Sequence, residues 1–171
     1  DPKARHWKCD IAQIASLSLA DDVVEFLASQ LQKLPEGTRE VLKLAACFGD
    51  AFNLSSLSAV SQMSRVETAA RLWPALQAGA VLPLSEEAKL ISGRSDKPTE
   101  KDSAVYVYRF LHERMQQAAY SLIPPEQKQA THLNIGRSIL KSSTEIEREE
   151  RIFEIVHQLN CGLDLIAEPL E

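Results

Sequence analysis

Apolar residues recur at the spacing of amphipathic helices through the first half of the chain. In each apolar stretch the side chains fall three or four positions apart, which places them on one face of an α-helix. Four such stretches follow one another, at residues 21–33, 38–49, 54–60 and 64–79. Pro35-Glu36-Gly37 separates the first two, and Thr38 and Ser64 are of residue types that cap helix N-termini. The pattern predicts four compact helices, with a cap at Thr38 and a capping box at Ser64–Glu67.

The pattern changes to that of short strands between residues 80 and 110. Ala80–Leu84 is a short apolar run, and Ala104–Phe110 is rich in β-branched and aromatic residues. The intervening Ser85–Ser103 is polar, carries charges of both signs, and is predicted to be a mobile loop. Compact helices followed by a strand, a long loop and a returning strand predict a winged-helix-like unit with this loop as its wing.

Helical spacing returns after Phe110. One helix is predicted at Leu111–Leu122, and the next begins near Pro125, because proline is tolerated in a first helical turn. Thr144–Glu147 has the pattern of a capping box and is predicted to open a helix that includes Ile152–Leu159. Antiparallel helices joined by short turns are typical of a solenoid.

These patterns predict a mainly α fold in three parts. Residues 1–20 are expected to be a leader or linker. Residues 21–110 are expected to form the winged-helix-like domain with its small β-hairpin. Residues 111–171 are expected to begin a helical, TPR-like array of antiparallel helices.

The composition is that of an ordinary soluble globular protein. Of the 171 residues, 44% are apolar and 25% are charged, and the formal net charge is −5. This charge gives no electrostatic reason to expect nucleic acid or an anionic membrane as a partner. No apolar run approaches the roughly 18 residues of a membrane span, and the first ten residues do not resemble a signal peptide. Since an initiator Met is also missing, we expect an excised piece of a larger cytoplasmic protein.

Motifs that carry catalysis are absent from the sequence. It contains no phosphate-binding P-loop, no dinucleotide-binding glycine pattern and no nucleophile elbow. His112-Glu113 begins as the zinc motif H-E-x-x-H does, but Gln116 stands where the second histidine is required. The cysteines lie far apart and form no C-x-x-C pair: Cys9, Cys47 and Cys161. We therefore expect no catalytic residue, no metal site and no cofactor in this chain.

The segment Tyr108–Tyr120 is the strongest candidate for a functional site. A predicted strand ends there, His112 and Glu113 follow at once, and a helix begins. A histidine at such a junction can project from the domain edge and donate a hydrogen bond to an anion. Alternatively, both residues only cap the new helix, with His112 half-buried against the sheet, since acidic residues are favoured at helix starts. The residues alone leave both interpretations open.

A winged helix can also bind DNA, through a helix that enters the major groove. The helix in that position, Ser64–Ala78, offers only Arg65 and Arg71 as cations, with Glu67 beside them. In the predicted wing, acidic residues cancel the lysines and arginines. Phosphate contacts supply most non-specific DNA affinity, so this charge distribution disfavours DNA binding.

Distinctive motifs occur at separated places in the chain, among them Thr38–Gly49, Leu72–Leu76, Phe110–Arg114, Gln116–Pro124 and Phe153–Val156. Together they resemble one region of large bacterial multi-sensor hybrid kinases: the winged-helix and helical-array region that follows the nucleotide-binding core. Such kinases join a serine/threonine kinase domain, an AAA/STAND-type ATPase module, a helical array, a GAF sensor and often a histidine kinase. The resemblance covers nearly the whole chain after the leader.

A less similar set of proteins is informative at the strand-to-helix junction. STAND ATPases, which include plant resistance proteins and apoptotic activators, place a Met-His-Asp motif there, and Leu111-His112-Glu113 is similar to it. In those ATPases the motif histidine reaches the nucleotide phosphates in the resting, ADP-bound state. The resemblance implies the same role for His112 in the intact parent protein, supported by Glu113, which would hold the local turn, and by Arg114. ATP or ADP is accordingly expected in the parent protein and not in this chain.

The resemblance and the missing motifs together predict a non-catalytic regulatory segment of a signal-transduction ATPase or kinase. We expect it to relay the nucleotide state of an absent ATPase core to neighbouring sensor and kinase domains of the same chain, in the cytoplasm and without a membrane. One alternative is a helical protein–protein interaction scaffold that never contacts nucleotide. A second, less favoured alternative is a DNA-binding winged-helix regulator.

Overall fold

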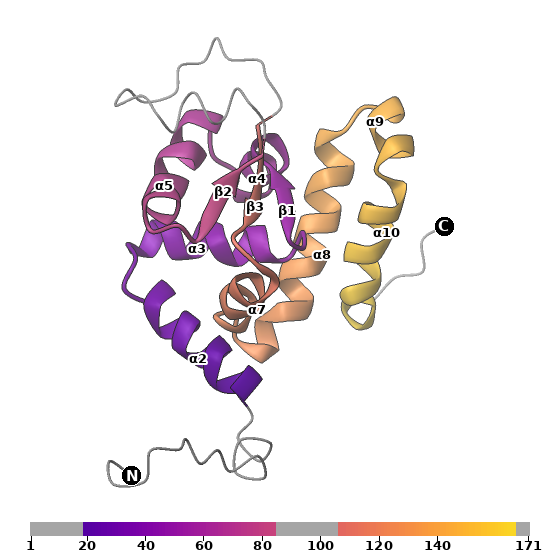
Figure 1. Cartoon of the computed structure of the whole chain (residues 1–171). Helices are drawn as coiled ribbons and strands as arrows, with labels where there is room; N and C mark the ends of the chain where they lie inside the picture. The colour runs from indigo at the N-terminus through magenta and orange to yellow at the C-terminus, as the bar shows by residue number, and fades with distance from the viewer. Residues whose placement is uncertain (1–18, 85–105, 167–171) are drawn as a thin grey trace, which may run out of the picture.

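The fold is mainly helical with one small sheet, as the hydrophobic pattern predicts. The computed structural model describes residues 19–84 and 106–166, and of residues 19–22 it describes the backbone alone. The elements follow one another along the chain as α2 (Leu19–Leu31), α3 (Glu36–Ala46), β1 (Ala51–Asn53), α4 (Leu54–Ser61), α5 (Arg65–Gln77), β2 (Val81–Pro83), β3 (Val107–Phe110), α7 (Glu113–Ser121), α8 (Pro125–Ser142), α9 (Glu145–Glu150), α10 (Ile152–Cys161) and the 3₁₀ helix η1 (Leu163–Leu165) (Figure 1).

The sheet is antiparallel and has the strand order β1-β3-β2. β3 lies in the centre, with Tyr108 opposite Phe52 of β1 and Arg109 opposite Leu82 of β2. The pair β2–β3 is the small β-hairpin that the sequence predicts. β1 is not predicted, because a strand of only three residues has no alternation long enough to recognise, and it is positioned by pairing with β3. The predicted wing, Ser85–Ser103, lies outside the described residues.

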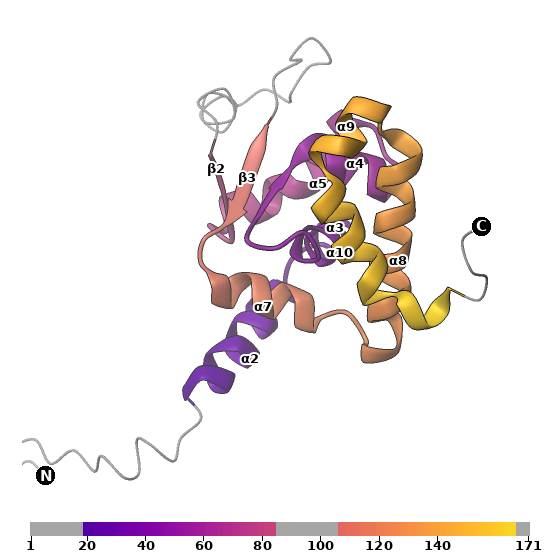
Figure 2. The ribbon, with the colours of Figure 1, turned by 90° about the vertical axis from the view of Figure 1, so that its right-hand side faces the viewer.

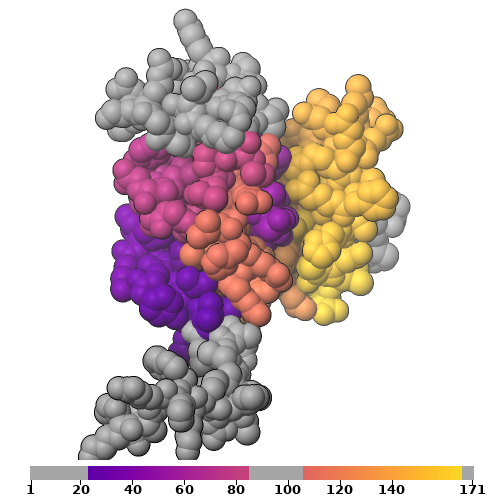
Figure 3. All heavy atoms as spheres, viewed as in Figure 1, coloured from indigo at the N-terminus to yellow at the C-terminus, as the bar shows by residue number. Residues whose placement is uncertain are grey.

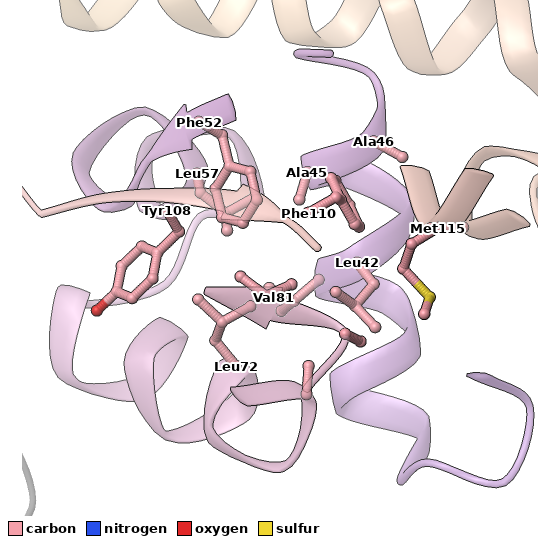
Figure 4. Close-up of a cluster of buried hydrophobic side chains, with 14 of the residues drawn as sticks. Leu42, Ala45, Ala46, Phe52, Leu57, Leu72, Val81, Tyr108, Phe110 and Met115 are labelled. Carbon is pink, nitrogen blue, oxygen red and sulfur yellow. The ribbon is translucent and has the colours of Figure 1, made fainter. Parts of the chain in front are cut away.

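The main core lies between the sheet and the helices of the N-terminal half. The rings of Tyr108 and Phe110, both on β3, flank that of Phe52, with centroid distances of 6.0 and 5.7 Å from it. Leu42 of α3 and Leu72 of α5 are fully buried in the same core (Figure 4). Burying large apolar side chains of this kind stabilises a fold by about 1.5–3 kcal/mol each.

α7 packs with the N-terminal helices and belongs to the same core. It contacts α2 and α3 extensively, and it crosses close to α2 below the sheet (Figure 2). Met115, Ala118 and Ala119 are buried in the main core, and the Gln116 side-chain amide donates a 2.7 Å hydrogen bond to the Ala46 carbonyl. These contacts fix α7, and with it the strand-to-helix junction, against the main core and the end of α3. The domain boundary between residues 110 and 111 stays a prediction.

A second, smaller core joins α8 and α10 to the end of α3. Its buried members are Ile123, Ile135, Ile139, Ile155 and Cys47. The C-terminal helices stand beside the N-terminal unit (Figure 3). Gly136 permits the close approach of α8 to α10, because a Cβ at this position would lie 2.8 Å from Cδ2 of Leu159.

Two of the three predicted N-terminal caps are confirmed and one is wrong. Ser64 caps α5, its hydroxyl accepting a 3.1 Å bond from the Glu67 amide. The reciprocal bond of the predicted capping box is not formed in the described residues, where the Glu67 carboxylate pairs with Arg71 instead. Thr144 forms the predicted capping box with Glu147 at the start of α9. Thr38, however, is buried in the first turn of α3, which begins two residues earlier with Pro35 at its N-cap.

The helix predicted to run on from Thr144 is divided in two. α9 ends at Glu150, and α10 begins at Ile152. At the break, the Arg151 guanidinium donates to both carboxylate oxygens of Glu154, at 2.9 and 3.1 Å. Two parallel bonds of this kind fix the geometry of a planar guanidinium, so the pair holds Arg151 at the start of α10.

Candidate functional site

The end of β3 is pinned on both of its edges. The Phe110 amide donates a 2.8 Å hydrogen bond to the Asp50 carbonyl, and the Leu111 amide donates a 3.0 Å bond to the Ala80 carbonyl. These bonds extend the two strand pairings by one residue on each side. They fix where the chain leaves the sheet, and therefore where His112 emerges.

His112 caps the N-terminus of α7 with both its backbone and its ring. Its backbone is extended, with φ −160° and ψ 166°. The ring nitrogen Nδ1 accepts a 3.3 Å hydrogen bond from the Met115 amide, and the carbonyl accepts from the same amide at 2.9 Å. The capping role was one of the two sequence interpretations. The accompanying expectation of a half-buried ring was wrong, because His112 is exposed.

The capping bond determines which nitrogen of His112 faces outward as a donor. Because Nδ1 accepts from an amide, a neutral ring carries its proton on Nε2. Among the described residues, Nε2 has no hydrogen-bond partner. Exposed donors at a helix N-terminus favour anions, since the unpaired amides and the helix dipole add positive potential. The junction thus presents one oriented N–H donor beside a positive helix end.

Glu113 and Arg114 are both held by Gln117 on the exposed face of α7. The Gln117 amide nitrogen donates a 2.9 Å bond to the Glu113 carboxylate, and its oxygen accepts a 3.2 Å bond from Arg114. Neither residue has a hydrogen bond to His112 in the described part of the chain. The structure therefore brings the three predicted site residues to one helix start, and it ties Glu113 and Arg114 to each other through Gln117.

A buried chain of hydrogen bonds connects α7 with the C-terminal helices. Nε2 of His132 lies 3.0 Å from the Tyr120 hydroxyl, and Nδ1 of His132 lies 2.7 Å from the Gln158 side-chain oxygen. The Gln158 amide nitrogen donates a 2.7 Å bond to the Cys47 carbonyl. The chain thus joins α7, α8, α10 and the end of α3. The sequence gives no signal for this hydrogen-bond chain, because no local pattern connects residues 47, 120, 132 and 158.

The Cys47 carbonyl sets the direction of every bond in this chain. A carbonyl only accepts, so the NH₂ group of Gln158 must point toward Cys47 and its oxygen toward His132. Nδ1 of His132 is then the donor, and Nε2 of the neutral ring accepts from the Tyr120 hydroxyl. His132 and Gln158 are buried, where unpaired polar groups are costly, so the order of donors and acceptors is strongly held.

One cation and burial act on Tyr120 and Cys47, the two ends of this hydrogen-bond chain. The Lys128 ammonium lies 4.4 Å from the centre of the Tyr120 ring, a cation–π contact. Burial raises the pKa of the Tyr120 hydroxyl, so the hydroxyl stays protonated and can donate to His132. Burial is also the main reason why the pKa of Cys47 rises to about 12, and its thiol is therefore protonated and unreactive at neutral pH.

Ion pairs reduce the free positive charge on the N-terminal helices. Arg71 of α5 pairs with Glu67 at 2.8 Å, and Lys43 of α3 pairs with Glu40 at 2.8 Å. Arg65 is therefore the one cation of α5 without an acidic partner in the described residues. The sequence already gives α5 few cations, and the ion pair of Arg71 with Glu67 reduces its free positive charge further.

α9, α10 and η1 carry an exposed apolar surface. Phe153 is 88% exposed, and further apolar side chains accompany it: Ile146, Ile152, Val156, Leu163 and Leu165. The opposite face of α10 is also apolar, with Ile155 buried against α8. A helix that is apolar on two faces is typical of the interior of a helical stack, because the outer face of a terminal repeat is polar.

The described residues contain no group of three or more His, Cys, Asp or Glu side chains that could hold a metal ion. None of the helices formed by residues 19–84 and 106–166 is long and apolar enough to cross a membrane.

The chain is similar to a hybrid signal transduction histidine kinase, histidine kinase G of Dictyostelium discoideum. The two sequences are 25% identical over 196 residues, which cover 95% of this chain and 6% of that protein. The chain thus spans a small part of the relative that it matches. No family model and no solved structure matches the chain. The similarity supports a signalling context associated with a histidine kinase, while the AAA/STAND and bacterial multi-sensor assignments stay predictions.

Proposed function

We propose that this chain is a regulatory segment, without catalytic machinery of its own, of a cytoplasmic signal-transduction protein. It relays the nucleotide state of an ATPase core in the parent protein to neighbouring sensor and kinase domains. His112 donates a hydrogen bond to a phosphate of the nucleotide bound in that core, and Glu113 and Arg114 support the helix start that presents it. ATP or ADP is therefore the ligand of the parent protein, and this chain contributes a contact to it.

The orientation of the His112 ring is the observation that carries this proposal. Capping of α7 uses Nδ1 and leaves Nε2–H free to donate a hydrogen bond to a phosphate oxygen at the edge of the unit. The backbone bonds from Phe110 and Leu111 hold this position rigidly. The element order from α3 to β3 and the strand order β1-β3-β2 support a winged-helix-like unit at this place.

Helix α7 supplies the physical route from this contact to the helical array. His112 lies at its first turn, and Tyr120 near its last turn begins the buried hydrogen-bond chain to α8 and α10. A displacement of α7 would move Tyr120 relative to His132, so it would either break a buried bond or carry α8 with it. The apolar surface around Phe153 then offers neighbouring helices of the parent protein a place to pack.

Two substitutions of His112 separate capping from phosphate contact. A serine in its place would retain a side-chain oxygen that caps α7 and would lose the imidazole donor, so His112→Ser is expected to leave the melting temperature unchanged. In the intact parent protein it should accelerate ADP release about ten- to a hundredfold, since a hydrogen bond to a charged group is worth about 1.5–3 kcal/mol. His112→Ala should accelerate release equally and also lower the melting temperature. Unchanged ADP release in both variants would refute the phosphate contact and leave a capping role.

A helical interaction scaffold without nucleotide contact is the second candidate function. The exposed apolar surface around Phe153 favours it, because such a surface fits protein partners. The two functions differ in how the parent protein responds to nucleotide. Phe153→Asp should abolish partner binding in both cases, whereas only the relay makes that binding depend on whether ADP or ATP is present.

A further inference from the structure

Helices α4 and α8 lie side by side and contact one another (Figure 2). Residues of both helices, together with Leu44 of α3, line a groove. Its volume is about 410 Å³. The apolar part of its lining is formed by Leu44, Val60 and Ile135, and Arg137, Lys141 and polar uncharged side chains complete the wall. This groove is separate from the His112 junction, and its residues have no part in the relay proposed above.

The charge of the groove is of one sign. No Asp or Glu is among its lining residues, although the chain as a whole has a net charge of −5. Arg137 and Lys141 have neither an ion pair nor a side-chain hydrogen bond within the described residues. They stand four residues apart on α8, so their side chains leave the same helix face about one turn, or roughly 6 Å, from each other.

The rim opposite α8 contains a backbone conformation that rarely accepts a side chain. Gln62 ends α4 with φ 55° and ψ 35°, in the left-handed region that glycine usually occupies at helix ends. A glutamine there is strained by about 1 kcal/mol or more relative to glycine. Its exposed amide lines the groove and adds a neutral donor and acceptor to the two cations.

We propose that this groove binds an acidic segment of a partner protein. An aliphatic side chain of that segment packs on the half-buried Leu44 and Val60, above the buried Ile135, and two carboxylates about one helical turn apart pair with Arg137 and Lys141. The match of charge selects an anion, and the apolar floor selects a peptide over a polyphosphate, because a phosphate chain has no group to bury there. The interaction is independent of the nucleotide contact of His112.

The proposal can be tested with a fluorescein-labelled helical peptide of about 14 residues. The probe carries Glu at positions i and i+4 with Leu between them, and a matched peptide carries Gln in place of each Glu. Fluorescence anisotropy should show that the Glu peptide binds the chain about tenfold or more tightly than the Gln peptide, with affinity falling as NaCl is raised. The double variant R137E/K141E should lose the preference for the Glu peptide.

The control variant K33E/R65E changes the net charge equally at exposed cations outside the groove and should bind as the unmodified chain does. Circular dichroism of both variants checks that they fold. Equal loss of binding in both variants, or no preference for the Glu peptide, would refute the proposal. So would equal competition by single-stranded DNA of the same charge, which would indicate a general polyanion surface. Concentration-dependent dimers lost only in R137E/K141E would show that a second copy fills the groove instead.

Discussion

Replacing Gln158 with leucine is expected to cost a large share of the stability of this chain. Leucine has nearly the same volume, so the change removes hydrogen bonds without creating a large cavity. Two buried groups lose their partner: the Cys47 carbonyl, which accepts from the Gln158 amide at 2.7 Å, and Nδ1–H of His132, which donates to the Gln158 oxygen at 2.7 Å. Gln158 is 1% exposed and His132 is 6% exposed, so water does not readily replace either bond.

The expected magnitude follows from the cost of an unsatisfied buried group. Each such group costs about 1–3 kcal/mol, so the two together should lower the free energy of unfolding by about 2–6 kcal/mol. The free energy of unfolding of a single domain is typically about 5–15 kcal/mol, so a loss of this size could unfold a chain at the lower end of that range. Burying the apolar leucine side chain recovers part of this free energy, so the net loss should lie below the upper end of the range.

Urea unfolding followed by circular dichroism measures this change, with the free energy extrapolated linearly to water. Asn160→Leu is the matched control, because Asn160 lies on the same helix but is exposed, and it should change the free energy by less than about 0.5 kcal/mol. A second substitution, His132→Phe, should cost less in the Gln158→Leu background than alone, since the unpaired Nδ1–H is then removed as well. Equal effects of the two leucine variants would refute the buried hydrogen-bond chain as a source of stability.

Three further outcomes are expected. Gly136→Val should lower the free energy of unfolding, measured in urea, by about 2 kcal/mol, because the valine side chain would meet Leu159 where α8 contacts α10. An unchanged free energy would mean that the two helices move apart at no cost. Iodoacetamide at pH 8 should label Cys161 in the folded chain and Cys47 only in urea, because burial raises the pKa of Cys47 to about 12. Peptide mass spectrometry measures the labelling of each cysteine, and equal labelling rates in the folded chain would contradict this expectation. Hydrogen bonds from the backbone and side chain of the α9 cap lower the pKa of Glu147 below its ordinary 4.5, so its contribution is present above that value and is lost as the pH falls through the lowered pKa. The stability difference between the unmodified chain and Glu147→Gln should therefore vanish on acidification, and a difference that persists at pH 2 would show that the carboxylate is not the cause.

Local sequence was sufficient for most elements and for the place of the candidate junction. The caps at Ser64 and Thr144 could be predicted because a helix start depends on side chains three residues apart. Thr38 was predicted to be a cap from its residue type alone, and this was wrong because packing buries it in the first turn of α3. The position of His112 between a strand and a helix followed from the change of hydrophobic period, while the use of its Nδ1 as the cap did not.

The sequence by itself determined the mainly helical class, the β2–β3 hairpin and the succession of helices after it, since these depend on the spacing of apolar residues within short segments. Tertiary structure decided what depends on contacts between distant segments. It placed β1 beside β3, packed α7 with α2 and α3, and brought Cys47, Tyr120, His132 and Gln158 into one chain of hydrogen bonds. No periodicity encodes these contacts, because each joins segments that are far apart in the sequence, and buried polar groups find their partners only once those segments share a core.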